Sequence, residues 1–174
     1  MRKIEVNEIA DRLCECIRKA QLTLGPEECE ALRRARAAES TPNARAILSD
    51  LENNHAIALA EKRPLCQDTG VAVIFMDLGQ EVQLVGGVLD EVLQQAVARA
   101  YRDNFLRASM VRHPLQRLNT GDNTPPVIHL KIVPGSGVRL RFAAKGGGCE
   151  NMSRLKMLPP AAGRDGVLDF VVET

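Results

Sequence analysis

Hydrophobic positions at the start of the chain recur at the three- and four-residue spacing of amphipathic helices. The first such stretch begins at Ile9, with Asn7 as a candidate N-cap, and ends before Gly25. Pro26 suits the first turn of a second helix that extends to about residue 38. The pattern therefore predicts two consecutive helices.

A third helix is predicted from Pro42 to about residue 61, with Thr41 as its cap. Its apolar stripe consists of Ala44, Ile47, Leu48, Leu51, His55, Ala58 and Leu59. A histidine on such a stripe is typical of a core histidine with a hydrogen-bond partner. Residues 1–62 are thus expected to be helical.

The pattern changes after Pro64. Residues 71–78 form a β-branched and aliphatic run that predicts a strand, and residues 83–85 are expected to pair with it. Helical spacing returns over residues 88–105, and a long polar loop follows over residues 113–126.

Two further strands are predicted over residues 128–133 and 138–143, around a Pro-Gly-Ser-Gly turn, and a last one over residues 167–172. The expected fold class is α+β (mixed), in which N-terminal helices precede a mixed β-sheet with flanking helices over residues 63–174. A chain of 174 residues with 45% hydrophobic content has room for one well-packed domain, residues 1–174.

Charge and aromatic content exclude some classes of partner. The 23 basic and 22 acidic residues are mixed along the chain, and aromatic residues make up only 3%. Nucleic acid is therefore not an expected partner. The N-terminal residues are charged every few positions, so neither a signal peptide nor a membrane span is predicted, and the expected location is the cytoplasm.

The chain has five cysteines, an odd number without an export signal, so reduced thiols or metal ligands are expected rather than disulfides. Cys14, Cys16 and Cys29 lie close in sequence, which raises the alternative of a zinc site with His55. Two positions apart on a helix, Cys14 and Cys16 point about 200° apart. They cannot chelate one ion together, and the zinc site is rejected.

Three polar segments are candidates for chemistry. The first, residues 63–70 (RPLCQDTG), places a cysteine beside an amide and a carboxylate between a helix and a strand. Its structural alternative is a buried free cysteine in a turn. The second, residues 119–126 (NTGDNTPP), also fits an ordinary Asx-rich loop. The third, residues 145–151 (KGGGCEN), could expose backbone N–H groups to an anion, but it lacks the features of a nucleotide-binding P-loop.

These segments, together with LRASMV at residues 106–111 and the extensions NTGDNTPPVIH and AKGGGCENMS, resemble the signatures of class I fumarate hydratases. They are similar to the N-terminal region of the fumarase and tartrate dehydratase α-subunit family. The resemblance covers essentially the whole chain and is least specific in the helical first third. The NTGDNTP loop and the GCENMS stretch resemble fumarase more than tartrate dehydratase.

The resemblance implies a [4Fe-4S] cluster held by three cysteines, with one iron open to act as a Lewis acid on the substrate hydroxyl. It assigns the first ligand to Cys66 and places Gln67 and the catalytic Asp68 against the substrate. It makes Arg107 a carboxylate clamp, a task that suits the planar guanidinium. It also places the backbone of residues 146–148, with Gly147 and Gly148, along the same pocket.

The sequence departs from the family pattern in two respects. The family's second and third cluster cysteines, its catalytic threonine, further arginines and a lysine belong to a C-terminal region that this chain does not contain. Cys149 stands where fumarases commonly have a serine, and the family geometry does not use it as a ligand. The resemblance therefore implies a chain that is inactive alone and needs that C-terminal region or a β-subunit.

The implied activity is reversible hydration of fumarate to (S)-malate, a reaction of the tricarboxylic acid cycle, in a homo- or hetero-oligomer. The alternatives are part of a tartrate dehydratase α-subunit, or a non-catalytic relative that binds a partner or a dicarboxylic acid.

Overall fold

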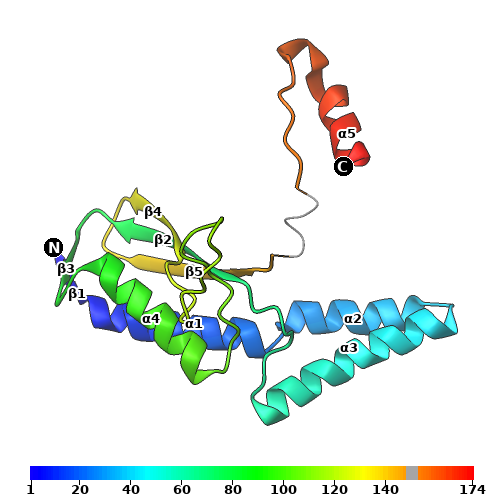
Figure 1. Ribbon diagram of the computed structural model, residues 1–174, viewed down its shortest axis with the longest axis horizontal. Helices are drawn as coiled ribbons and strands as arrows, with labels where there is room; N and C mark the ends of the chain where they lie inside the picture. The colour runs from blue at the N-terminus through cyan, green and yellow to red at the C-terminus, as the bar shows by residue number, and fades with distance from the viewer. Residues whose placement is uncertain (148–152) are drawn as a thin grey trace.

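A computed structural model describes residues 1–147 and 153–174 (Figure 1). The helices are α1 (Val6–Leu22), α2 (Pro26–Ala38), α3 (Pro42–Glu61), α4 (Leu89–Asp103) and α5 (Gly163–Glu173), with a 3-10 turn at Pro160–Ala162. The strands are β1 (Arg2–Glu5), β2 (Val71–Gly79), β3 (Val82–Val85), β4 (Val127–Val133) and β5 (Val138–Lys145). The predicted α+β class is confirmed.

The main sheet has three strands in the order β4-β2-β5, so the first of them in sequence lies in the centre. β2 runs parallel to β4 and antiparallel to β5, which makes the sheet mixed as predicted. β4 and β5 are not paired with each other, although the sequence pattern suggested two strands joined by a turn. The strands separate because the turn between them passes over the end of β2.

Three backbone hydrogen bonds hold that turn over the end of β2. The amides of Gly79, Gln80 and Glu81 donate to the carbonyls of Gly137, Val133 and Gly135 at 2.8, 2.8 and 3.0 Å. A Cβ atom on Gly79 would clash with the carbonyl oxygen of Gly135. A glycine at this position therefore lets the crossing chain approach closely.

The core lies between this sheet and the helices α1 and α4, which pack side by side on one of its faces (Figure 1). β2 contributes every second residue to the core, and each helix contributes residues three or four positions apart. These spacings follow from the two-residue repeat of a strand and the 3.6-residue repeat of a helix. The largest buried apolar side chains are Leu13, Ile17, Ile74, Met76, Leu93, Val6 and Val97. Fully burying one such side chain stabilises the fold by roughly 1.5–3 kcal/mol.

The opposite face of the sheet is open. Phe75 of β2 stacks on His129 of β4 with ring centroids 4.9 Å apart, and Asp77 accepts an ion-pair contact from Arg141 of β5 at 3.1 Å. His129, the last residue of the NTGDNTPPVIH motif, thus contacts a strand neighbour on this face.

The helices α2 and α3 form a hairpin that extends away from the sheet (Figure 1). Their predicted bounds are confirmed, but the apolar stripe of α3 is not a buried face, since Ile47 and Leu59 are 61% and 56% exposed. His55 is only half-buried and lies 3.6 Å from the sulfur of Cys29 on α2, so it is not a core histidine. α2 and α3 contact mainly each other, so the apolar stripe of α3 is left uncovered.

Two predictions for the N-terminal part are wrong. Residues 2–5 form a strand, β1, which pairs with β3 in a separate parallel sheet, so residues 83–85 do not pair with β2. Only Ile4 of β1 is buried, and the charges beside it concealed the strand in the sequence. Helix α1 begins at Val6, with Glu5 rather than Asn7 at the N-cap.

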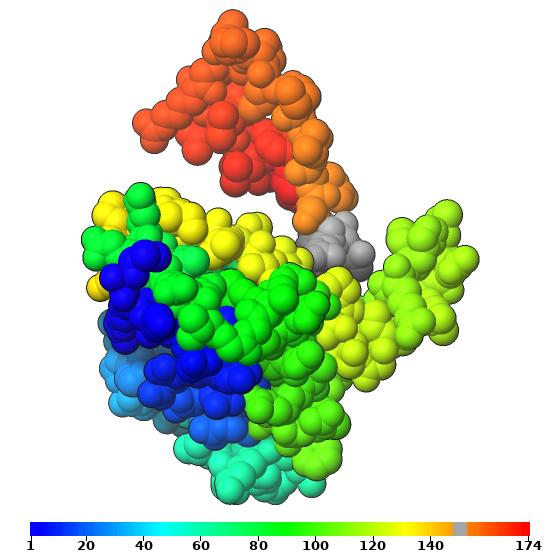
Figure 2. All heavy atoms as spheres, turned by 90° about the vertical axis from the view of Figure 1, so that its left-hand side faces the viewer, coloured from blue at the N-terminus to red at the C-terminus, as the bar shows by residue number. Residues whose placement is uncertain are grey.

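The predicted last strand is also wrong, because residues 163–173 form helix α5. A β-branched run becomes a strand only where a neighbouring strand can pair with it, whereas a helix satisfies its own backbone hydrogen bonds. None of the residues of α5 is buried. Figure 2 shows this segment in orange to red and, apart from it, a small projection in yellow-green around residues 110–118. No helix in the described ranges has both the length and the apolar content needed to cross a membrane.

Candidate functional site

The loops that carry the predicted site residues meet at one edge of the main sheet. Since β2 and β4 are parallel and β5 is antiparallel to both, the starts of β2 and β4 lie beside the end of β5. Val71 at the start of β2 pairs with Lys145 at the end of β5. The residues before β2, before β4 and after β5 therefore share this edge. Gly148 and Cys149 lie outside the described residues.

The loop before β2 presents Cys66, Gln67 and Asp68 to solvent. The backbone N–H of Asp68 donates to the Cys66 sulfur at 3.5 Å, and the sulfur lies 3.5 Å from the Gln67 side-chain oxygen. The alternative of a buried cysteine in a turn is wrong, because Cys66 is exposed. An outward thiol with an amide N–H directed at its sulfur suits a metal ligand, since such hydrogen bonds help to tune Fe–S sites.

Two glycines allow this loop to lie against the end of β5. Gly70 has φ +66°, and a Cβ atom there would come within 2.6 Å of the Lys145 carbonyl group. A Cβ atom on Gly146 would lie 3.0 Å from a carboxylate oxygen of Asp68. The structure thus brings Asp68 directly over the glycine segment, with the exposed Gly147 next in sequence.

Arg107 lies in the loop that follows α4, and its side chain is exposed. Its carbonyl accepts a hydrogen bond of 3.1 Å from the hydroxyl of Thr69, which fixes the backbone of this loop against the backbone of the Asp68 loop. The structure therefore places the Arg107 loop beside the Asp68 loop at this edge of the sheet, with the Arg107 side chain exposed.

The segment at residues 119–126 combines a local turn with one inward residue. Asn119 accepts from the amide of Gly121 at 2.7 Å, and Asp122 accepts from the hydroxyl and amide of Thr124 at 2.7 and 3.0 Å. The hydrogen bonds from Thr124, that of its hydroxyl first, lower the pKa of Asp122. Asn123 instead is fully buried. The Asx-turn interpretation holds for the exposed residues of the segment and fails for Asn123.

Buried polar side chains that the sequence analysis did not select support the Asp68 loop from below. Gln21, Tyr101 and Asn123 come from α1, α4 and the loop before β4, and all three donate to the carbonyls of Thr69 or Gly70 at 2.7–3.1 Å. Of these residues, Tyr101 could have been selected from the sequence. It is the single tyrosine, and its hydroxyl needs a hydrogen-bond partner when the ring is buried.

Ionisation of Tyr101 should weaken the fold at high pH. Burial raises the pKa of Tyr101 to about 12, against about 10 in an unfolded chain. The unfolded state therefore releases the proton first, so this contribution to stability is complete below about pH 10 and is lost as the pH rises towards about 12. The expected loss in the free energy of unfolding reaches roughly 3 kcal/mol.

Urea unfolding at about pH 9 and about pH 11.5 measures this loss. Tyr101→Phe should be less stable than the wild type at the lower pH and should lack the additional loss at the higher pH. An equal pH dependence in both proteins would contradict the assignment to Tyr101.

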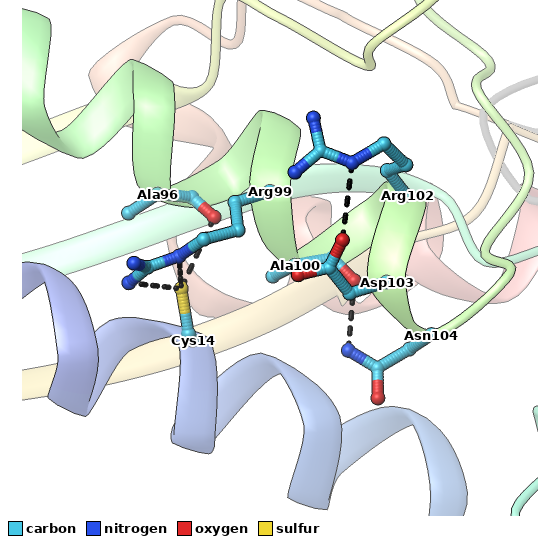
Figure 3. A network of polar contacts seen from close by, with 7 residues as sticks. All are labelled: Cys14, Ala96, Arg99, Ala100, Arg102, Asp103 and Asn104. Atoms are coloured by element: carbon cyan, nitrogen blue, oxygen red, sulfur yellow. Dashed lines mark hydrogen bonds and ion pairs between the residues drawn. The ribbon is translucent and has the colours of Figure 1, made fainter.

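Cys14 lies in a contact between two helices rather than at the candidate site. Cys14 donates to the carbonyl of Ala96 at 3.3 Å and accepts from two guanidinium nitrogens of Arg99 at 3.4 and 3.3 Å (Figure 3). Arg99 also pairs with Asp11 at 2.6 Å, and these hydrogen bonds, that of Cys14 first, raise the pKa of Arg99. The contact joins α1 to α4. Within residues 1–147 and 153–174, no group of three His, Cys, Asp or Glu side chains could hold a metal ion.

The candidate site is an open surface. A groove of about 660 Å³ lies elsewhere, between α2 and α3, and is lined by residues that include Arg33, Arg36 and Arg45. Two of these arginines already pair with Glu30 and Glu52 at 2.7 and 3.2 Å. The side chains of Cys66, Asp68 and Arg107 do not line this groove.

Comparisons with known proteins show which sequences this chain is similar to. The sequence model of the Fumerase family, described as fumarate hydratase, matches residues 10–174. The "Putative L(+)-tartrate dehydratase subunit alpha" of Methanocaldococcus jannaschii is 33% identical over 174 residues, which cover 96% of this chain and 60% of that protein. The L(+)-tartrate dehydratase subunit alpha of Escherichia coli strain UTI89 is 30% identical, with 97% and 56% covered.

A third relative, fumarate hydratase 2 of Leishmania major, is 37% identical over 119 residues, which cover 67% of this chain and 21% of that protein. The chain thus spans at most 60% of the length of each of these relatives.

Proposed function

Because the chain belongs to the fumarate hydratase (Fumerase) family, we propose that it forms one wall of a hydro-lyase active site that adds water to, or removes it from, a four-carbon dicarboxylic acid. The observation that carries the proposal is the shared edge of the sheet. There the exposed Cys66, Gln67 and Asp68 lie against the glycine segment after β5 and beside the loop of Arg107.

Cys66 is the residue that would hold the cofactor, as one of three thiolate ligands of a [4Fe-4S] cluster. Its exposure and the amide N–H at its sulfur fit that task. When bound, such a cluster supplies an open iron that acts as a Lewis acid on the substrate hydroxyl. In this proposal the further ligands come from a segment or subunit beyond this chain, as the family resemblance implies; within residues 1–147 and 153–174, Cys66 is the one cysteine in the site loops.

The residues around Cys66 bind and orient the substrate. The Asp68 carboxylate, fixed over Gly146, is placed to accept a hydrogen bond from a substrate hydroxyl. Gln67 offers an amide to a carboxylate, and Arg107 offers two parallel N–H donors to one. The backbone N–H groups of Gly147 and Gly148 would add donors on the same side, although Gly148 lies outside the described residues.

Fumarate and (S)-malate are the first proposed substrate pair. The NTGDNTP and GCENMS motifs support this choice, as does the description of the matching family. L(+)-tartrate is the second candidate, because the relatives that match nearly the whole chain are named as tartrate dehydratase α subunits. The same names support the proposal that a further polypeptide or segment completes the site in an oligomer.

Activity assays of the complete enzyme test this proposal. After anaerobic reconstitution with iron and sulfide, the chain joined by the missing segment or subunit should dehydrate (S)-malate or L(+)-tartrate, and the preferred substrate should have the higher kcat/KM. Residues 1–174 alone should show no turnover.

The comparison of the two preparations separates the alternatives. A complete, cluster-loaded protein that converts neither acid would contradict the hydro-lyase proposal and favour a non-catalytic relative. Turnover by residues 1–174 alone would contradict the proposal that a second wall is needed.

A further inference from the structure

The geometry assigns a positioning role to two buried residues, Asn123 and Tyr101. They hold the Cys66–Asp68 loop at the angle that catalysis needs, by binding the two backbone carbonyls that follow Asp68. This inference rests on the proposed function, because it concerns the same site.

The two carbonyls share three side-chain donors. The carbonyl of Thr69 accepts from Gln21 at 2.7 Å and from the hydroxyl of Tyr101 at 3.1 Å. The carbonyl of Gly70 accepts from the same hydroxyl at 3.1 Å and from the Asn123 amide at 3.0 Å. The single proton of the phenol is shared between both carbonyls. Each carbonyl therefore has one amide donor of its own.

Asn123 also joins two parts of the site. Its side-chain oxygen accepts from the backbone N–H of Ser109 at 2.7 Å, while its nitrogen donates to Gly70. It therefore connects the backbone near Arg107 with the backbone near Asp68. Its backbone has φ +62°, a conformation that asparagine adopts more readily than most residues.

The hydrogen bonds of this network converge on the two buried residues directly after Asp68, where β2 begins. The site side chains themselves are exposed, so their own packing cannot fix them. Their direction depends on the backbone beneath, and displacement of a catalytic group by about 1 Å can cost about a hundredfold in rate.

Two variants remove the donors with little change in shape. Asn123→Asp keeps the acceptor for Ser109 but replaces the donor to Gly70 with an oxygen. Tyr101→Phe keeps the ring and leaves each carbonyl one donor, so its effect should be the smaller. Asn104→Asp is the matched control, because the Asn104 amide also donates to a backbone carbonyl, that of Ala100 at 2.8 Å, but within the last turn of α4 rather than to the Asp68 loop.

Amide hydrogen exchange of residues 1–174 tests the positioning directly. In Asn123→Asp, the backbone of residues 66–70 should exchange at least about tenfold faster than in the wild type, while exchange in α1 and β5 stays unchanged. Tyr101→Phe should give a smaller local increase, and Asn104→Asp none. Equal acceleration throughout the chain, or none at residues 66–70, would overturn the inference.

Kinetics of the complete enzyme give the second readout. At a temperature where each variant is folded, kcat should fall about tenfold or more in Asn123→Asp, while KM changes less and the Asn104→Asp control keeps the wild-type kcat. An active wild type with unchanged kcat in Asn123→Asp would overturn the positioning role. An inactive wild type would contradict the proposed function, and hydrogen exchange would still decide the inference.

Discussion

Cys66→Ser in the complete enzyme should abolish both iron binding and turnover. Cys66 is the only described cysteine that lies in the candidate site, and its exposed sulfur already receives an N–H from Asp68. Loss of one of three thiolate ligands leaves an incomplete set, and metal affinity depends on the whole set. Since loss of a residue that merely orients a ligand costs about 10–100-fold, activity should fall by more than about 100-fold. Iron content per protomer and visible absorption measure the loss.

Two serine variants serve as controls for this result. Cys29→Ser removes a half-buried thiol next to His55 on the α2–α3 hairpin, and the iron content should remain. Cys149→Ser introduces the residue that fumarases commonly carry, so it should also keep the iron and most of the activity. If Cys149→Ser emptied the site while Cys66→Ser did not, the ligand assignment would be wrong.

Asp68→Asn should lower kcat strongly and leave the fold intact. The carboxylate is exposed and held over Gly146, so the nearly isosteric amide has room and the free energy of unfolding should change by less than about 0.5 kcal/mol. Loss of an interaction that strengthens in the transition state typically costs about 100–1,000-fold in kcat. Steady-state kinetics and urea unfolding, measured on the same preparation, separate the two effects.

Asp103→Asn provides the comparison for Asp68. Asp103 is an exposed carboxylate at the end of α4 that pairs with its neighbour Arg102 at 3.0 Å. Its replacement should change neither kcat nor the unfolding free energy by much. Wild-type turnover in Asp68→Asn would remove Asp68 from the catalytic site.

The sequence alone predicted those elements whose ends carry strong local signals. The bounds of α2 and α3 follow from prolines at their first turns, and both were predicted correctly. β1 was missed because only Ile4 faces inward among charged neighbours. Residues 163–173 have the composition of a strand but no strand to pair with, and pairing is a property of the whole fold.

The site was predictable to the extent that loops carry exposed polar residues in recognisable motifs. The structure brings the loops of Cys66, Asp68, Arg107 and Gly147 to one edge of the sheet, although the roles of these residues remain proposals. Asn123 could not be separated from its exposed neighbours, because turn-forming composition does not reveal which side chain points inward. Burial of that kind follows from three-dimensional packing alone.

The central position of β2 affects how the chain folds during synthesis. β2 leaves the ribosome before either of its neighbours, and α1, made earlier still, packs on β5. The edge of β2 that pairs with β5 therefore remains without its strand partner until Lys145 has emerged. Contacts between residues so far apart in sequence form slowly, and apolar strands exposed meanwhile are prone to aggregate. We expect the nascent chain to depend on chaperones until β5 closes the sheet.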